Sequence, residues 1–475
     1  MSHDPSVPPA FRPGSLEETQ PGRVAPIDRS LAPAIPLLAS FGALWLVVAA
    51  AFGLVARLQL ELPGFLACES LTHGHLRAAE SHLLFYGWGL NAALAVLLWV
   101  THRLGKVELR VGWAPVVGGL GLNLLVGWGT LAILGGGATG VAGLEMPRSG
   151  AFLLAACFAT VALWCTSAFS RRHTGYVFVS QWYALAAVLA FPLAYLLAQA
   201  SVLWWPSRGV VQAIAAAWYG QMANGLFLVP AALAALYYVL PKTLGRPVSA
   251  YYLAVVGFWT YVIFAPWSGA AQLVGSPVPV WVQSVGVVAS AMLVVPAVVV
   301  ILNLVGTWVA GPRPSFREAP SLRFAGLAVA AFALWGLIGT VLPFRSVSAV
   351  VRFSELAEAH ALLGTQGFIA PALLAALYYL LPRVTERAWP SLGLISAHFT
   401  LVFIGVMGGV ATAALHGWSR SHADAAITAD ASTWAGLASL CQVLVVVGHL
   451  AFLLHVLLLL APRGGRRESH LPSAR

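Results

Sequence analysis

Two pairs of ionisable side chains stand out because each lies at the end of a long apolar run. Glu80 and His82 form one Glu-x-His pair, and Glu358 and His360 form the other. Ionisable side chains are costly inside a bilayer, and in membrane proteins they mark functional sites. Imidazole is a common ligand of haem iron. The two pairs therefore predict a haem held between His82 and His360.

The composition indicates that nearly all of the chain is membrane core. Of 475 residues, 59% are hydrophobic and 9% are charged, whereas soluble domains carry about 25% charged residues. Mean hydropathy is +0.83. Twelve apolar runs approach or exceed the roughly 20 residues that a spanning helix needs. They cover residues 35–56, 81–101, 113–136, 150–170, 176–201, 210–240, 249–271, 280–308, 322–343, 356–381, 391–416 and 432–461. We predict an all-α polytopic membrane protein.

Charge outside these runs predicts the topology. Basic residues gather in alternate loops, at residues 102–110, 171–173, 242–246, 313–317 and 383–387. By the positive-inside rule these loops and both termini face the cytoplasm, in a membrane of the bacterial inner-membrane type. We expect residues 1–32 to be a disordered tail without the regions of a signal peptide. Residues 33–462 then form the membrane domain, and residues 463–475 form a basic tail. The net charge of +10 is explained by these loops, so nucleic acid is not an expected partner.

This topology places both histidines near the outer face. His82 is expected in the first turn of the second spanning helix, and His360 in the second turn of the tenth. At about 1.5 Å of rise per residue, each lies less than roughly 10 Å below its helix start. The four cysteines form no C-x-x-C-H motif, so a covalently attached c-type haem is excluded.

An internal repeat relates the second, sixth and tenth spanning helices. The segment from Pro230 to Lys242 recurs from Pro371 to Arg383, and residues 91–103 are a weaker echo. Both strong copies end in Tyr-Tyr-x-Leu-Pro and a basic residue. We therefore predict three pseudo-symmetric four-helix units. Repeat interfaces commonly hold the sites of membrane proteins, so these three helices are where chemistry is expected.

Short motifs in a fixed order extend this pattern along the chain. They are Trp218-Tyr219-Gly220-Gln221, Tyr237-Tyr238 through Pro247, Trp267-Ser268-Gly269, Trp281 through Ser284, Tyr378-Tyr379 through Pro382, and Ala397-His398-Phe399. The sequence thereby resembles subunit I of the haem-copper oxidase and nitric oxide reductase superfamily, closest to the catalytic subunit of C-type (cbb-class) cytochrome c oxidases. The resemblance covers roughly residues 35–462. It implies the twelve-helix fold, haem iron and a role in respiratory electron transport.

The same resemblance implies that the oxygen-reducing site is degenerate. In the family, the positions of Gln221, Ala271 and Gln272 are copper-binding histidines, and a carboxamide is a poor substitute for imidazole. The tenth helix of the family carries His-x-His, whose first member binds the oxygen-reactive haem and whose second binds a low-spin haem. Here Glu358 stands at the first position and His360 at the second. One low-spin b-type haem and no copper are expected.

The other axial ligand of that haem is expected on the second spanning helix. His82 is one candidate. Glu80 is the alternative, because it stands at the family's ligand position in an alignment without gaps, although an ion pair with Arg77 would equally explain it. Four arginines are candidates for pairing with haem propionates: Arg77, Arg345, Arg352 and Arg420. The remaining histidines of the last two helices, His398, His449 and His455, are expected to pack or to form hydrogen bonds.

Three functions remain open. The first is a degenerate subunit-I homologue that does not reduce oxygen by itself and passes electrons within a membrane complex. Its partners would be outer-side redox subunits, a c-type cytochrome or quinol. The second is a haem-free structural or assembly subunit, and the third is an oxygen or nitric oxide reductase with substituted ligands. A metal site built from both Glu-x-His pairs is disfavoured, since di-iron bundles use Glu-x-x-His to keep both side chains on one face.

Overall fold

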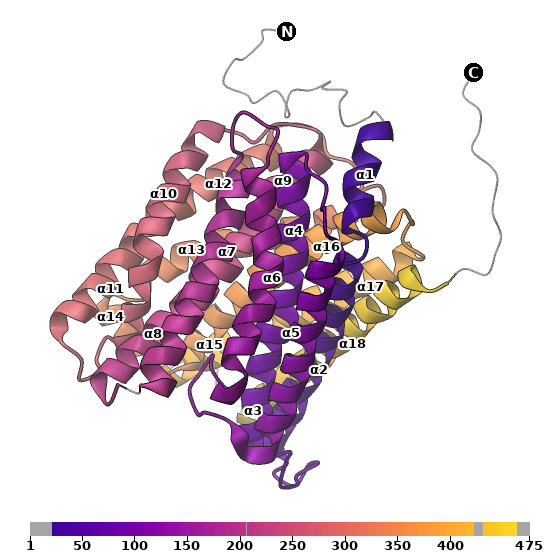
Figure 1. Cartoon of the computed structure of the whole chain (residues 1–475). Coiled ribbons are helices and arrows are strands. Elements are labelled where there is room, and N and C mark those ends of the chain that lie inside the picture. The colour runs from indigo at the N-terminus through magenta and orange to yellow at the C-terminus, as the bar shows by residue number, and fades with distance from the viewer. Residues whose placement is uncertain (1–20, 206, 422–430, 463–475) are drawn as a thin grey trace.

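The computed structural model describes residues 21–205, 207–421 and 431–462, and within them all regular structure is helical (Figure 1). In chain order the elements are α1 (Pro21–Leu31), α2 (Ile35–Glu61), α3 (His73–His82), η3 (Leu83–Gly89), α4 (Leu90–Gly105), α5 (Trp113–Ala132), η4 (Ile133–Gly137), η5 (Arg148–Gly150), α6 (Ala151–Ser170), α7 (Val179–Ala198), η6 (Gln199–Trp204), α8 (Val210–Ala223), η7 (Asn224–Leu228), α9 (Val229–Leu244), α10 (Tyr251–Ser268), η8 (Gly269–Leu273), α11 (Val280–Met292), α12 (Val294–Val309), α13 (Ser321–Val341), α14 (Arg345–Val351), α15 (Glu355–Leu362), η9 (Leu363–Ile369), α16 (Ala370–Thr385), α17 (Leu392–Ser421) and α18 (Ala431–Leu460).

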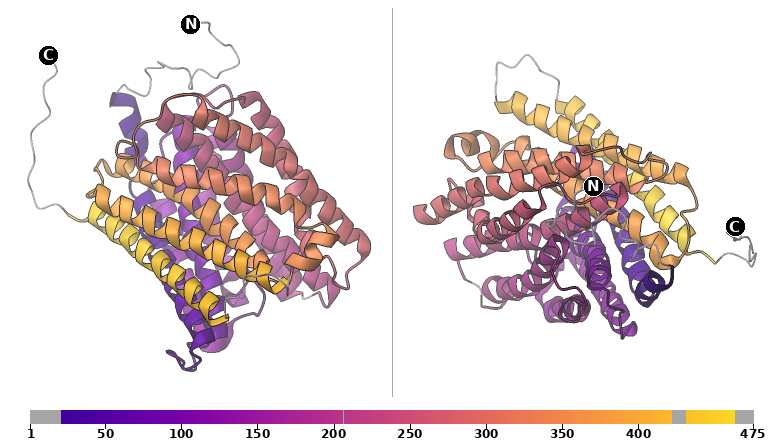
Figure 2. Two further views of the ribbon diagram at one scale, coloured as in Figure 1. Left: turned by 180° about the vertical axis from the view of Figure 1, so that it is seen from behind. Right: turned by 90° about the horizontal axis from the view of Figure 1, so that it is seen from above.

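Several of these elements join end to end, giving twelve segments of the described chain that are long and apolar enough to cross a membrane. The prediction of twelve spanning helices is therefore confirmed. The segments stand side by side in one bundle, and the last two, α17 and α18, pack along its outside (Figure 2).

The three helices related by the internal repeat lie at the centre of the bundle. They are α3–η3–α4, α8–η7–α9 and α15–η9–α16. Their most apolar windows are 89%, 94% and 78% buried, whereas no other span exceeds 44%. Helices that are apolar on all sides are expected in such a core. The repeat thus identifies the helices that hold the units together.

Each central helix contains a π-helical segment at the same place in the repeat. These segments are η3, η7 and η9, and the basic residue that ends each repeat comes fourteen positions later. Arg103 follows Gly89, Lys242 follows Leu228, and Arg383 follows Ile369. The match extends the repeat to the first unit, where the sequence echo is weak. π-Helical turns inside α-helices are frequent at functional sites.

The second spanning helix begins earlier than expected, which corrects the depth of His82. Polar residues from His73 onward continue the helix beyond the apolar run, and the Thr72 side chain caps it by accepting a hydrogen bond from the His75 backbone N–H at 3.3 Å. His82 is therefore in the third turn, about 14 Å from the helix start. His360 is in the second turn of α15, as predicted.

The prediction of a disordered tail over residues 1–32 is wrong for its last part, because residues 21–31 form α1. Asp28 of α1 accepts hydrogen bonds from Trp99 at 3.0 Å and from Arg103 at 3.1 Å. Ile27 and Leu31 are buried. These contacts dock α1 on the C-terminal end of α4. Residues 1–20 and the predicted basic tail 463–475 lie outside the described residues.

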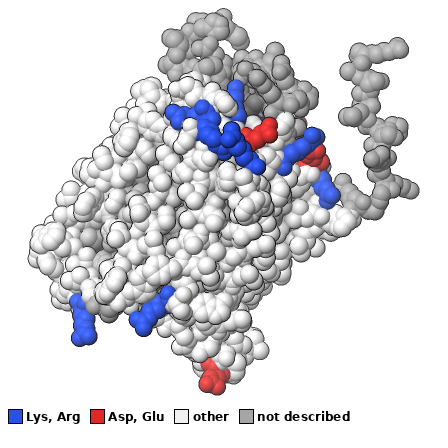
Figure 3. All heavy atoms as spheres, viewed as in Figure 1, with Lys and Arg blue, Asp and Glu red and all other residues white. Residues whose placement is uncertain are grey.

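Basic side chains gather at the end of the bundle where α1 lies, and few are visible at the opposite end (Figure 3). This distribution agrees with the loop pattern that predicts the topology. The end where α1 lies is called the basic end, and the opposite end, which the loop pattern predicts to face outward, is called the outer end.

Candidate functional site

Three cavities adjoin the central helices. The His360 cavity, about 420 Å³, lies among α8, α10, η8, α13, α14 and α15. The Glu358 cavity, also about 420 Å³, lies among α2, α3, α15, α17 and α18. The central cavity, about 670 Å³, lies between η3, α8 and η9. It shares Arg77, Glu80 and Gln366 with the Glu358 cavity and Gln272 with the His360 cavity.

The His360 cavity brings together four residues that the sequence singled out. Gln221, Ala271 and Gln272 line it, and so does His360. The His360 imidazole stacks on Trp335 with ring centroids 5.9 Å apart, and its Nε2 lies 3.1 Å from the Trp335 carbonyl oxygen. Among the described residues that line this cavity, His360 is the only imidazole. It faces α13, away from the second spanning helix.

Arg352 closes one side of the His360 cavity. Its Nη2 donates to the Ala271 carbonyl at 2.6 Å, its Nη1 donates to the Gln272 carbonyl, and its Nε donates to the Ser348 hydroxyl at 3.2 Å. Burial lowers the pKa of this guanidinium below its ordinary value. Arg352 therefore ties α14 to the end of the seventh spanning helix and leaves a cation beside the cavity.

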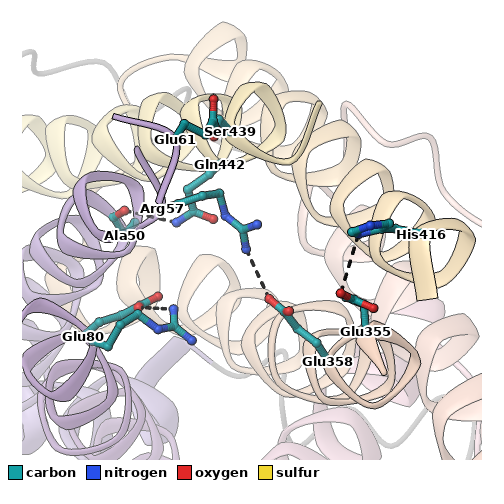
Figure 4. A network of polar contacts seen from close by, with 10 residues as sticks. Ala50, Arg57, Glu61, Glu80, Glu355, Glu358, His416, Ser439 and Gln442 are labelled. Atoms are coloured by element: carbon teal, nitrogen blue, oxygen red, sulfur yellow. Dashed lines mark hydrogen bonds and ion pairs between the residues drawn. The ribbon is translucent and has the colours of Figure 1, made fainter. Parts of the chain in front are cut away.

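The Glu358 cavity is built from charged residues instead (Figure 4). Arg57 of α2 donates to Glu358 at 3.2 Å, and Arg77 donates to Glu80 at 2.6 Å. The Glu80 carboxylate lies against Gly53 of α2, where any larger residue would clash with it. The predicted ion pair between Arg77 and Glu80 is confirmed. Glu80 and Glu358 thus face one another across this cavity.

Further polar contacts extend the Glu358 cavity towards the outer end. Glu355 accepts from Arg420 at 2.5 Å and lies 3.8 Å from His416 Nδ1. On the α18 side, Gln442 donates to the Ala50 carbonyl at 3.1 Å. These contacts join α15 to α17 and α18 to α2, and Figure 4 shows Glu355 beside His416 and Gln442 beside Ala50.

His82 lines none of the three cavities and faces α5. Its ring is fully buried, and its Nε2 lies 3.3 Å from the Val126 carbonyl oxygen. Gly129 of α5 leaves room for the ring, because a Cβ there would lie 3.0 Å from Nε2. On its other side His82 contacts Tyr86. Tyr86 belongs to an aromatic compartment made of Phe85, Tyr86, Phe158, Phe191, Tyr195, Tyr219 and Phe227.

Glu145 holds the residue between Glu80 and His82. It accepts hydrogen bonds from the Ser81 hydroxyl and from the Gly143 backbone N–H, both at 2.8 Å. Burial raises the pKa of this carboxyl above its ordinary value. Glu80 and His82 lie on opposite sides of α3 because they are two residues apart, about 200° around the helix, and the Ser81–Glu145 bond ties this turn to the loop that contains Glu145.

The threefold repeat explains which way each side chain faces. Nine positions before the end of each π-helical segment lie Glu80, Tyr219 and His360. Each faces a different compartment. Glu80 faces the Glu358 cavity, and His360 faces the His360 cavity. Tyr219 faces the aromatic compartment, where its hydroxyl lies 2.8 Å from the Tyr86 hydroxyl.

Two positions later the side chains face the other neighbouring compartment. The residues there are His82, Gln221 and Leu362. His82 faces the aromatic compartment, Gln221 the His360 cavity and Leu362 the Glu358 cavity. Each central helix therefore separates two compartments and presents one position of an i, i+2 pair to each.

In this arrangement Glu358 and His360 face other cavities than the resemblance implies. The resemblance puts Glu358 beside Gln221, Ala271 and Gln272, but it pairs with Arg57 on the other face of α15. His360 is expected opposite His82, but it lies in the cavity of Gln221. His82 and His360 are not brought together. They lie two positions apart when the repeats are aligned, and they therefore face different compartments.

The four candidate arginines divide between the sites. Arg77 lines the central and Glu358 cavities, and Arg352 lines the His360 cavity. Arg420 is paired with Glu355, and Arg345 begins α14 without lining any of the three cavities. In the part of the chain that the structure describes, no group of three or more His, Cys, Asp or Glu side chains is placed to hold a metal ion.

Arg57 is not among the residues predicted from the sequence, and Gln442 and His449 have no predicted role in the Glu358 cavity. His449 is buried, lines this cavity and has no hydrogen-bond partner at either ring nitrogen. The signal that could have found Arg57 is its place as a lone arginine in an otherwise apolar span. An arginine at such a place needs a partner or an aqueous cavity.

The chain is similar to subunit I of known respiratory oxidases. The model of the family described as "Cytochrome C and Quinol oxidase polypeptide I" matches residues 35–450. The chain is 26% identical over 384 residues to a cytochrome c oxidase subunit 1 homolog of Azorhizobium caulinodans, covering 78% of this chain and 68% of the relative. It is also 26% identical over 391 residues to the Cbb3-type cytochrome c oxidase subunit CcoN1 of Stutzerimonas stutzeri, covering 78% and 80%.

A solved structure shows the same fold. A heme-copper terminal oxidase, determined as a dimer by cryo-electron microscopy, superposes with a TM-score of 0.74 at 14% identity, covering 91% of this chain and 85% of that one.

Proposed function

The chain belongs to the family of cytochrome c and quinol oxidase polypeptide I, and we propose that it is a member that has lost oxygen reduction and keeps one haem position, at His360. Its role is that of a subunit in a respiratory membrane complex. The observation that supports this most directly is the lining of the His360 cavity. Three of the positions that the resemblance assigns to copper ligands carry Gln221, Ala271 and Gln272, and they surround one remaining imidazole.

In this proposal the haem would lie in the His360 cavity. A volume of about 420 Å³ falls within the roughly 300–1,000 Å³ of cofactor pockets. His360 would supply the axial nitrogen, and Arg352 would place positive charge beside a propionate. When bound, the haem would supply redox chemistry. Gln221 and Gln272 line the same cavity, and their amide groups coordinate copper poorly.

The low-spin state expected from the sequence requires a second axial ligand. None of the described residues lining the His360 cavity is a second imidazole. His360 would therefore be the one imidazole of this cavity to hold the haem, and carbon monoxide is expected to bind to it. Electron transfer to outer-side redox subunits, a c-type cytochrome or quinol remains part of the proposal, and its direction depends on the partner.

The test is spectroscopic. The full-length protein is purified with the subunits that accompany it, and dithionite-reduced minus oxidised spectra are recorded before and after adding carbon monoxide. We expect one b-type haem per chain that binds carbon monoxide, without consumption of oxygen or nitric oxide. A haem insensitive to carbon monoxide would contradict the single-ligand site. Steady consumption of oxygen or nitric oxide would contradict the loss of catalysis and favour a reductase with substituted ligands.

A second candidate function, the haem-free structural or assembly subunit, is favoured by the Glu358 cavity. There the ion pairs of Arg57 with Glu358 and of Arg77 with Glu80 connect α2, α3 and α15. Charged pairs of this kind join helices without a cofactor. If the purified protein contains no haem while its partner subunits assemble normally, this second function replaces the first.

A further inference from the structure

A short segment at the outer end of the bundle forms part of the wall of the His360 cavity. Residues 342–354 connect the ninth span, which ends at Val341, to the tenth, which begins at Glu355. They contain α14, which lies at the end of the bundle opposite α1 (Figure 1), and we call them the strap. The strap residues that line the cavity are Leu342, Pro343, Ser348, Val351 and Arg352. The strap therefore lies between the interior of the cavity and the outer end.

Little apolar packing holds the strap in place. Of the seven residues of α14, Ser348 alone is buried. Phe344, Val350 and Phe353 are 44%, 46% and 97% exposed, and they add little to the packing of the strap. Segments with few buried apolar contacts open locally at a low free-energy cost. The closed position of the strap therefore depends on its polar contacts.

Arg352 makes the polar contacts that close the strap. Its Nη2 donates to the Ala271 carbonyl at 2.6 Å, and its Nη1 donates to the Gln272 carbonyl. Both carbonyls belong to η8, at the outer end of the seventh span. Among the described residues, no other hydrogen bond or ion pair joins the strap to a span that it does not itself connect. Hydrogen bonds from a charged guanidinium are about twice as strong as neutral ones, so this one side chain holds the strap.

The other arginine of α14 offers a matched comparison. Arg345 is the first residue of α14 and is exposed. It lines none of the three cavities. The two arginines thus lie at the two ends of one short helix, and Arg352 is the one that is bound to η8.

The second four-helix unit shows that the fold does not require a strap. Its corresponding connection, between the fifth and sixth spans, consists of residues 205–209. That connection has five residues, whereas the strap, residues 342–354, has thirteen. A few residues suffice to join neighbouring helices of a bundle. The additional length in the third unit therefore calls for a role other than connection.

We propose that the strap opens and closes the outer mouth of the His360 cavity, and that Arg352 is the latch that holds it closed. The strap turns about its two ends, at Pro343 and at Ser354. The Ser354 side chain caps α15 by accepting a hydrogen bond from the Leu356 backbone N–H at 3.3 Å. Because this cap fixes the start of α15, the strap moves while α15 and His360 stay in place.

Opening the strap changes what reaches the cavity. With the strap open, water and small polar molecules from the outer side enter the cavity of about 420 Å³. With the strap closed, they are excluded. Loops that close over a site in this way shield it from water and move in microseconds to milliseconds. The proposal concerns access to the cavity and does not depend on the presence of a haem at His360.

The experiment measures how fast a thiol inside the cavity reacts. Thr340 lines the cavity and is 7% exposed, so Thr340→Cys places a reporter thiol behind the strap. The purified full-length protein is treated with 2-sulfonatoethyl methanethiosulfonate, a small and negatively charged thiol reagent, and each cysteine is followed by peptide mass spectrometry. Adding Arg352→Gln is expected to raise the reaction rate of the reporter thiol about tenfold or more, because the closed position loses its latch. Loss of the cation alone would lower the rate, since it weakens the attraction of the reagent.

The matched control is Arg345→Gln in the same Thr340→Cys protein, whose rate should equal that of the parent. Arg352→Lys keeps the charge but has fewer donors in a less fixed geometry, so an intermediate rate is expected. Two natural cysteines serve as references in every variant. Cys68 is exposed and should react fast at a constant rate, and Cys165 is buried and should stay unreactive.

Three results would overturn the proposal. The first is a reporter thiol that reacts no faster with Arg352→Gln than with Arg345→Gln. The second is a parent protein whose reporter thiol reacts as fast as Cys68, because the cavity would then be open without any movement of the strap. The third is a rate that rises at Cys165 together with the reporter thiol, since the whole bundle and not the strap would then have loosened.

Discussion

The two cavities on either side of α15 differ in the chemistry that one helix presents to them. The His360 cavity is lined by one imidazole, by amides and by apolar rings, with Arg352 at its edge. The Glu358 cavity contains both charges of two ion pairs, Arg57 with Glu358 and Arg77 with Glu80. Because Glu358 and His360 are two residues apart, about 200° around the helix, one turn of α15 serves both. Substitutions can therefore change the ligand site on one face of α15 without changing the ion pairs on the other face.

The largest effect is expected for the substitution of His360, the one imidazole among the described residues that line the His360 cavity. His360→Ala should lower the haem content by more than about tenfold, because axial imidazoles and their supports hold the iron. The matched control is His82→Ala, which changes a buried ring facing α5 and should leave the haem content unchanged. Haem is measured per chain from the reduced spectrum.

The opposite result would remove the distinction between the two cavities. If His82→Ala loses the haem and His360→Ala retains it, the haem lies on the side of the second spanning helix. The expectation of a haem between His82 and the tenth helix would then be restored.

A smaller effect, on the free energy of unfolding, is expected when either ion pair is broken. The loss should be larger for Arg77–Glu80 than for Arg57–Glu358. Arg77→Ala leaves Glu80, whose side chain is 13% exposed, without its close partner, at a cost of about 2 kcal/mol. Arg57→Ala leaves Glu358, which is 52% exposed, and should cost about 0.5 kcal/mol. Thermal unfolding in detergent micelles measures both.

The double variant Arg77→Ala with Glu80→Gln supplies the control for this difference. The uncharged amide needs no cation, so part of the lost stability should return. Equal melting temperatures for Arg77→Ala and Arg57→Ala would show that burial does not distinguish the two pairs.

The sequence predicts the part of this structure that depends on local pattern. Apolar runs identify the twelve spans, and the Tyr-Tyr-x-Leu-Pro endings identify the central helices. The start of the second span is not predicted correctly. Its first turns, from His73 onward, are polar, so hydropathy assigns them to a loop, whereas Thr72 caps them as a helix. The partner of Arg57 also escapes, since Glu358 lies 301 positions away in the sequence.

The cavities that Glu358 and His360 line differ from the prediction for another reason. An i, i+2 pair fixes that the two side chains diverge, but not which one faces which neighbour. Alignment to the family's His-x-His motif places Glu358 beside the copper positions, whereas it lies with Arg57. Counting back from the aligned ends of the repeats puts Glu80 and His360 at equivalent positions. That internal frame would have assigned His360 to the cavity of Gln221.

The smallest effect is expected at Glu145, which lies outside both cavities and fixes Ser81. Burial raises the pKa of this carboxyl in the folded protein above the roughly 4.3 of an unfolded chain. The folded state therefore binds the proton more readily, and stability falls as pH rises from the unfolded pKa through the folded one. Glu145→Gln should remove this decline, a change on the order of 1 kcal/mol or less. Melting temperatures between pH 4 and pH 7 measure it, and a decline of equal slope in both proteins would assign the pH dependence to another group.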